Sequence, residues 1–105
     1  MDTVTIFTDG GSRGNPGPAA GAYVLFDENK NQLAAFAKFL PHATNNIAEY
    51  TGLVNALEKA YTLGAENIKI YSDSELMVRQ INGDYKVKNE GLRELFARAC
   101  DLLTK

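Results

Sequence analysis

The spacing of the apolar residues changes partway along this chain, and that change constrains the fold more than any other feature. Three early segments, Thr3–Thr8, Gly21–Asp27 and Gln32–Leu40, have the alternating and β-branched or aromatic character of strands. From Asn46 onward, apolar side chains recur at steps of three and four residues until Gly64, a residue type that commonly ends helices. The pattern predicts an antiparallel meander of three strands followed by one long helix.

The rest of the chain returns to a strand and then to helices. Asn67–Ser72 predicts a fourth strand, Ser74–Asn82 a short helix, and the segment from about Gly91 to the end a last helix. A helical crossover returns a strand parallel to the one before it, with right-handed connection. If the fourth strand lies beside the first, the sheet is mixed, and both strands finish at the edge where open α/β sheets bind ligands. We therefore expect one α/β domain.

The composition is that of a small folded domain without a strong charge bias. The 105 residues are 45% hydrophobic with a formal net charge of −2, which argues against disorder and does not favour a nucleic-acid binder unless bound cations supply positive charge. A single cysteine excludes an intrachain disulfide and suits a reducing compartment. Without a signal-peptide pattern or an apolar run of membrane length, we expect a cytoplasmic protein with no membrane partner. The five phenylalanines are expected mostly in the core.

Two acidic residues follow the strands that are expected to be parallel neighbours. Asp9 closes the first strand before a glycine-rich segment, and the alternative interpretation is a turn residue, because Asp-Gly is a common turn signal. Asp73 closes the fourth strand, and the alternative is a helix N-cap, for which aspartate is favoured. Ser72 and Ser74 would serve equally well as caps, so a cap does not require this acid.

A third acid, Glu49, falls in the first predicted turn of the long helix. The segment from Asn46 to Glu49 resembles a capping box, in which the glutamate reaches back to the cap amide. Helix geometry also places Glu49 at the margin of the apolar stripe, where a side chain skirts the sheet. Both interpretations stay open from the sequence.

Taken together, the three acids favour a metal site. The ends of two parallel strands and the start of the crossover helix meet in this topology, and three carboxylates brought so close cannot all stay ionised without a cation. Oxygen ligands of this kind suit Mg²⁺ or Mn²⁺, which accept phosphate oxygens as further ligands. A pair of such ions can activate a water against a phosphodiester and stabilise the leaving oxygen.

The motifs that carry these acids resemble the successive signatures of type 1 ribonuclease H. They are TDGGSRGNPG at residues 8–17, TNNIAEY at residues 44–50 and IYSDS at residues 70–74. The resemblance implies a ribonuclease H-like mixed sheet of order 3-2-1-4, with a fifth strand next in the family, and an endonuclease that cleaves the RNA strand of RNA–DNA hybrids. It also implies Mg²⁺ or Mn²⁺ as cofactor, two ions being bound together with substrate.

The resemblance assigns roles residue by residue. Asp9, Glu49 and Asp73 match the catalytic metal-binding acids, and Gly10 is a further metal-contacting position. Asn45 is matched either to a contact with a base edge or to a helix cap. Positions expected to contact the hybrid are Gly11, Ser12, Asn15, Asn45, Asn46, Ser74, Lys86 and Lys88. For the two lysines, the alternative is a solvated loop that contacts nothing.

The chain departs from the family pattern after its last helix. The family continues into a fifth strand, a loop bearing a histidine, and a helix that opens with a fourth aspartate. His42 does not match that histidine. We therefore expect weakened metal binding and an open edge on the fourth strand, which favours a homodimer. The alternatives to a hybrid ribonuclease are a non-catalytic hybrid-binding module and a subunit that assembles through the open edge.

Overall fold

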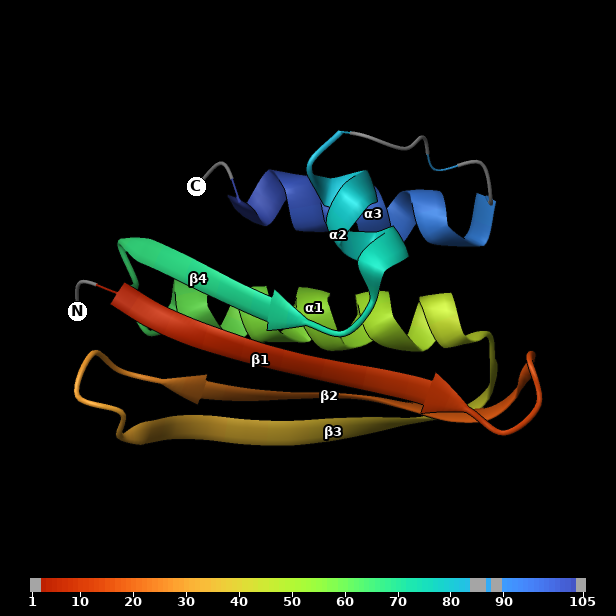
Figure 1. Ribbon diagram of the computed structural model, residues 1–105, viewed down its shortest axis with the longest axis horizontal. Helices are drawn as coiled ribbons and strands as arrows, with labels where there is room; N and C mark the ends of the chain where they lie inside the picture. The colour runs from red at the N-terminus through yellow and green to blue at the C-terminus, as the bar shows by residue number, and fades with distance from the viewer. Residues whose placement is uncertain (1–2, 84–86, 88–89, 104–105) are drawn as a thin grey trace.

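The computed structural model describes residues 3–83, 87 and 90–103. In these residues four strands and three helices follow one another in the predicted order (Figure 1). The elements are β1 (Thr3–Ser12), β2 (Gly17–Phe26), β3 (Gln32–Ala43), α1 (Asn45–Thr62), β4 (Asn67–Ser72), α2 (Glu75–Ile81) and α3 (Glu90–Leu103). The change in the spacing of apolar residues predicted three strands followed by a long helix, and the structure confirms that prediction.

The strands form one mixed sheet of order β3-β2-β1-β4. β1 pairs antiparallel with β2 and parallel with β4, and β2 pairs antiparallel with β3. The α1 crossover thus returns β4 alongside β1, as predicted, and the predicted fold class is confirmed. Within the described residues, no helix is both long and apolar enough to span a lipid bilayer.

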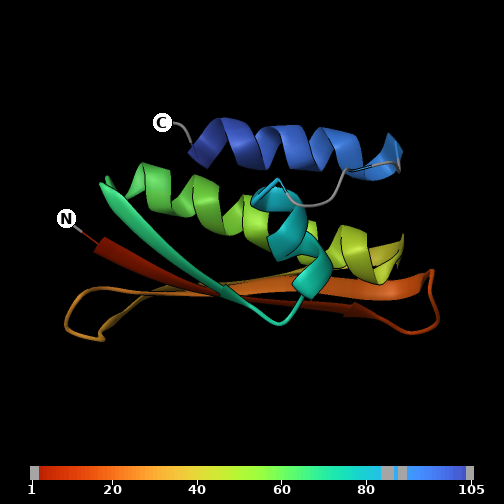
Figure 2. The ribbon, with the colours of Figure 1, turned by 45° about the horizontal axis from the view of Figure 1, so that its top comes forward.

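The helices lie on one side of the sheet, with α3 stacked over α1 (Figure 2). Because α1 has the sheet on one side and α3 on another, it buries side chains around much of its circumference. Alternate residues of β1, such as Val4 and Ile6, point into this core and are fully buried, together with Leu53 and Leu57 of α1. This layering holds the first half of α1 against the centre of the sheet.

β1, β2 and β3 are longer than the sequence predicted. The glycine-rich segment after Asp9 was expected to be irregular, but β1 continues to Ser12 and β2 begins at Gly17. The prediction was wrong because Gly10 and Gly21 are paired across the two strands, and an extended strand tolerates glycine where another backbone approaches closely. β3 likewise extends through Pro41 to Ala43, which is possible because β3 is an edge strand.

The face of the sheet opposite the helices exposes aromatic side chains. Phe39 is 68% exposed, Tyr71 53% and Phe7 46%. On the helix side, Phe36 near the sheet edge is also 53% exposed. The expectation that the phenylalanines lie mostly in the core is therefore wrong for Phe7, Phe36 and Phe39. Alternation along a strand shows which side chains point to the same face of the sheet, but it does not show whether another layer covers that face.

Candidate functional site

The register of the parallel pair brings Asp9 and Asp73 side by side. The last residues paired between β1 and β4 are Thr8 and Ser72. Asp9 is the next residue of β1, and Asp73 is the first residue after β4 ends. Both aspartates are exposed, and neighbouring strands lie only about 4.8 Å apart. One oxygen of Asp9, Oδ1, accepts a hydrogen bond from the Gly10 amide at 2.9 Å. Asp9 therefore lies inside a continuing strand and does not serve as a turn residue.

Close backbone contacts bring Glu49 to the same place. A Cβ atom added to Gly10 would lie 2.7 Å from the Glu49 nitrogen, and one added to Gly21 would clash with the Ala48 backbone oxygen. A Cβ on Gly52 would likewise meet β2, 2.8 Å from the Ala22 oxygen. Helix and strands therefore approach backbone to backbone, which only glycine permits at these positions.

The helix caps exclude the structural interpretations of two of the acids. Thr44 caps α1 by accepting a hydrogen bond from the Ile47 amide at 3.1 Å. Glu49 therefore lies beyond the first turn, and the predicted capping box from Asn46 to Glu49 is wrong. Ser74 caps α2 by accepting a hydrogen bond from the Met77 amide at 3.2 Å, so Asp73 is not the cap. Neither acid is needed to begin its helix.

Glu49 is in an environment that disfavours its ionised form. Its Oε2 atom is buried and has no hydrogen-bond partner among the residues that the structure describes. Burial, followed by the charges of Asp9 and then Asp73, raises the pKa of Glu49 from 4.5 to about 7. The three carboxylates therefore share one electrostatic environment, although they come from three different elements. A buried carboxylate oxygen of this kind requires a proton or a cation nearby.

These residues fit a hydrated Mg²⁺ or Mn²⁺ ion better than a closed metal cage. In the described ranges, no three side chains of His, Cys, Asp or Glu are arranged closely enough to hold an ion by themselves, so the compact three-carboxylate cluster expected from the sequence is not preformed. Mg²⁺ usually retains several waters and is held by one or two carboxylates with substrate phosphates. The unpartnered Glu49 oxygen and the two exposed aspartates match that requirement.

The raised pKa of Glu49 predicts a dependence of stability on pH. Between pH 4.5 and 7 the unfolded chain loses this proton before the folded protein does, so Glu49 lowers stability as pH rises and its full cost is present above pH 7. The free energy of unfolding of Glu49→Gln, relative to that of the parent protein, should increase by about 1–2 kcal/mol when the pH is raised from 4.5 to 8. This value is reduced to allow for the partial exposure of Glu49. Urea denaturation at both pH values measures it.

The exposed Glu66→Gln variant is the control for this pH effect. Its stability relative to the parent protein should change little over the same pH interval. A Glu49→Gln difference that is the same at both pH values would show that Glu49 titrates as an ordinary solvated glutamate.

Three of the residues expected to contact substrate form one hydrogen-bonded network. The Asn45 Oδ1 atom accepts hydrogen bonds from the Ser12 amide at 2.8 Å and from the Ser12 hydroxyl at 3.0 Å. The backbone amide of Asn45 in turn donates a hydrogen bond to Asn15 Oδ1 at 3.0 Å. The network ties the β1–β2 connection to the beginning of α1. Of the two interpretations of Asn45, the helix cap is excluded, because Thr44 caps the helix.

The structure describes three of the other residues that were expected to contact substrate. Gly11 is exposed on β1, Asn46 is half-buried in the first turn of α1, and Ser74 is half-buried at the start of α2. Lys86 and Lys88 lie outside the described residues.

The sequence did not reveal the Thr44 cap or the glycines that allow the helix to approach the sheet closely. An isolated glycine inside a helical pattern, as at Gly52, was the signal that could have revealed the close contact.

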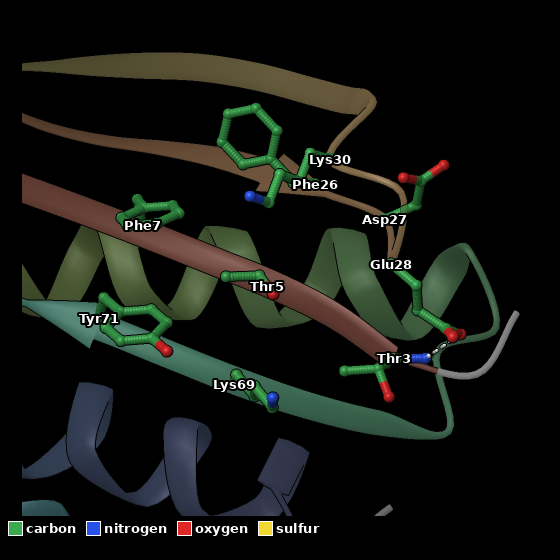
Figure 3. A pocket seen from close by; sticks show the side chains of 9 residues that line it. All are labelled: Thr3, Thr5, Phe7, Phe26, Asp27, Glu28, Lys30, Lys69 and Tyr71. Carbon is green, nitrogen blue, oxygen red and sulfur yellow. Dashed lines mark hydrogen bonds between the residues drawn. The ribbon is translucent and has the colours of Figure 1, made fainter.

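One cavity of the sheet lies away from the carboxylates. It has a volume of about 530 Å³ and lies on the sheet face opposite the helices, around Phe7, Phe26 and Tyr71 (Figure 3). The Phe7 ring stacks on Tyr71 at 5.1 Å between ring centres and meets Phe26 edge-on at 5.7 Å. Lys30 and Lys69 also line the cavity. It belongs to the first half of β1, whereas Asp9 and Asp73 lie where the paired segment of β1 and β4 ends.

Comparison with known proteins assigns the family. The profile described as "Reverse transcriptase-like" matches residues 7–105. A ribonuclease HI of Halobacterium salinarum is 41% identical over 101 residues, 96% of this chain and 51% of its own length. A bifunctional protein of Mycobacterium tuberculosis is 45% identical over 103 residues, 97% of this chain and 28% of its own. The chain therefore spans about half or less of these curated relatives.

Solved structures agree in fold and in sequence. The N-terminal RNase H domain of the Mycobacterium tuberculosis protein, solved as a fusion with maltose-binding protein, has a TM-score of 0.94 and 42% identity, covering 97% of this chain and 74% of that one. The LC11 RNase H1 in complex with an RNA/DNA hybrid has a TM-score of 0.89 and 41% identity, covering 96% and 76%. The chain belongs to the reverse transcriptase-like family, and among its members to the type 1 ribonucleases H.

Proposed function

We propose that this domain cleaves the RNA strand of RNA–DNA hybrids with Mg²⁺ or Mn²⁺ bound at Asp9, Glu49 and Asp73. The observation that carries the proposal is the buried and unpartnered Glu49 oxygen, whose pKa is raised by burial and by the two aspartates. The Gly10 backbone, beside the Glu49 amide, is a further proposed ligand. The bound ions, two in the presence of substrate, would supply activation of the attacking water and stabilisation of the leaving oxygen.

The residues of the chain orient the substrate in this proposal. The network of Ser12, Asn15 and Asn45 sets the β1–β2 connection against α1, where Gly11 and Asn46 offer backbone and amide groups to the RNA strand. Such groups distinguish RNA from DNA by hydrogen bonds to the 2′-hydroxyl. Ser74 would contact the strand from the beginning of α2, and Lys86 and Lys88 would contact phosphates of the DNA strand. The hybrid bound to the related LC11 enzyme supports this substrate class.

The net charge of the chain agrees with a metal-dependent mode of binding. At −2 the protein does not attract phosphates by its overall charge, so bound cations would supply the positive charge that phosphate contacts require. We further propose a cytoplasmic location, because the single cysteine suits a reducing compartment.

A labelled RNA–DNA hybrid incubated with Mg²⁺ or Mn²⁺ tests the function. We expect fragments of the RNA strand only, and none when a chelator removes the metal or when the same sequence is supplied as duplex DNA. Binding of the hybrid without cleavage would favour a non-catalytic hybrid-binding module. Cleavage that persists in the chelator would contradict the metal-dependent mechanism.

We also propose self-association through the outer edge of β4, considering only the strands that the structure describes. Within the described strands β4 pairs with β1 alone, and unpaired backbone groups on an edge are a template for another strand. Exposed Tyr71 and Phe7 on the same sheet add apolar surface. We expect a homodimer by sedimentation at high concentration that Tyr71→Lys dissociates, because a charge on an edge strand disfavours pairing. A parent protein that remains monomeric would contradict this expectation.

A further inference from the structure

A buried hydrogen bond joins α1 to α2 close to the candidate metal site. The Tyr50 hydroxyl donates to the Gln80 Oε1 atom at 2.6 Å. Tyr50 is fully buried and Gln80 is only 5% exposed. The bond therefore links the two helices directly through two buried side chains.

The two partners lie next to the elements that carry two of the acids. Tyr50 directly follows Glu49 in the chain, and Gln80 is in the last turn of the helix that begins just after Asp73. α2 has only seven residues and buries only Met77 and Gln80. A short helix with so few buried side chains depends strongly on each of them for its orientation.

The position of Asp73 is constrained from both sides. Its strand is held by the β1–β4 pairing up to Ser72, and its helix begins at the Ser74 cap. The Ser74 amide also donates to the Ser72 hydroxyl at 3.1 Å, which makes the link between strand and helix short. A change in the orientation of α2 is therefore transmitted to the backbone at Asp73, whereas Glu49 stays on α1.

We propose that the Tyr50–Gln80 hydrogen bond is a positioning contact that sets Asp73 relative to Glu49 for metal binding. The inference rests on the proposed function, because it assigns metal binding to those two acids. The simpler alternative is that the bond only satisfies two buried polar groups and stabilises the fold. The two differ in whether metal affinity changes in a protein that is fully folded.

The test measures Mn²⁺ binding to the nucleic-acid-free protein by electron paramagnetic resonance. We expect Tyr50→Phe to weaken binding about tenfold, because removal of groups that orient metal ligands has effects of this size. Tyr23→Phe is the matched control, since Tyr23 is also buried but lies on β2, and it should bind Mn²⁺ as the parent protein does. Equal weakening in both variants, or none in Tyr50→Phe, would overturn the proposal.

A double variant separates positioning from stability. Replacing both partners of a buried hydrogen bond by apolar groups is less disruptive than replacing one, so Tyr50→Phe with Gln80→Met keeps the test readable if the single variant unfolds. It should bind Mn²⁺ as weakly as Tyr50→Phe while folded. Recovery of parental affinity would show that the bond has a structural role only.

The outcome for the parent protein distinguishes the two proposals. If the parent protein shows no Mn²⁺ binding that is lost in Asp9→Asn and also cleaves no hybrid, the proposed function fails, and this inference fails with it. If it cleaves the hybrid but binds no Mn²⁺ without nucleic acid, only the positioning inference fails. If the parent protein binds Mn²⁺ and Tyr50→Phe binds it equally well, only the positioning inference fails.

Hydrogen exchange tests whether the bond anchors α2. The Met77 and Val78 amides, at the beginning of α2, should exchange faster in Tyr50→Phe, and unchanged exchange would contradict the anchoring of α2 by this bond.

Discussion

Asp9→Asn should lower cleavage of the RNA strand of a hybrid by at least about a hundredfold, since loss of groups that merely orient metal ligands already costs 10–100-fold. The asparagine keeps an Oδ1 atom, so it can still accept the hydrogen bond that the Gly10 amide donates to Asp9. It removes one of the two charges that raise the pKa of Glu49. We therefore expect an intact fold, little loss of stability and a strong loss of metal-dependent turnover.

The measurement compares initial cleavage rates at saturating Mg²⁺ with the unfolding midpoint of each variant. Glu94→Gln is the control, because Glu94 is exposed on α3, and it should retain the parental rate. An Asp9→Asn variant that cleaves the hybrid at more than a tenth of the parental rate would remove Asp9 from the catalytic residues. Loss of both activity and folding would instead show that Asp9 is needed for the structure.

Gly10→Ala should lower the free energy of unfolding by about 2–3 kcal/mol or more, as expected for an overpacked backbone contact. The new methyl group would lie 2.7 Å from the Glu49 nitrogen and 2.8 Å from the Ala48 carbonyl carbon. Both atoms belong to the backbone, so no side-chain rotation relieves the clash. To accommodate the methyl group, α1 would have to move away from β1, which also separates Glu49 from Asp9.

Gly11→Ala is the matched control one residue further along the same strand. Its added methyl group would have Asn45 Oδ1 as its nearest neighbour, at 4.0 Å, so the stability change should stay within about 0.5 kcal/mol. Urea denaturation followed by circular dichroism measures both variants. Equal stability losses would mean that the cost comes from glycine replacement in a strand and not from the close approach of α1.

Much of the fold follows from patterns within short stretches of the sequence. The bounds of β4 agree with the predicted Asn67–Ser72, and Gly64 follows the end of α1 with a φ of 82° that favours glycine. The order of strands and helices predicted that β4 returns parallel after α1, and the resemblance to type 1 ribonuclease H implied its place beside β1. Periodicity and turn residues are local properties, so they can be interpreted without knowing what packs on each element.

Local patterns in the sequence were thus sufficient for the order of the elements, and the family resemblance supplied the pairing of β1 with β4. The continuation of β1 through its glycines and the exposure of Phe7 and Tyr71 on one sheet face could not be predicted from local patterns. The tertiary structure decided both features, and it also decided the burial that raises the pKa of Glu49. Each of these depends on how closely one backbone approaches another or on which surface remains uncovered, and those distances are set by packing between elements far apart in the chain.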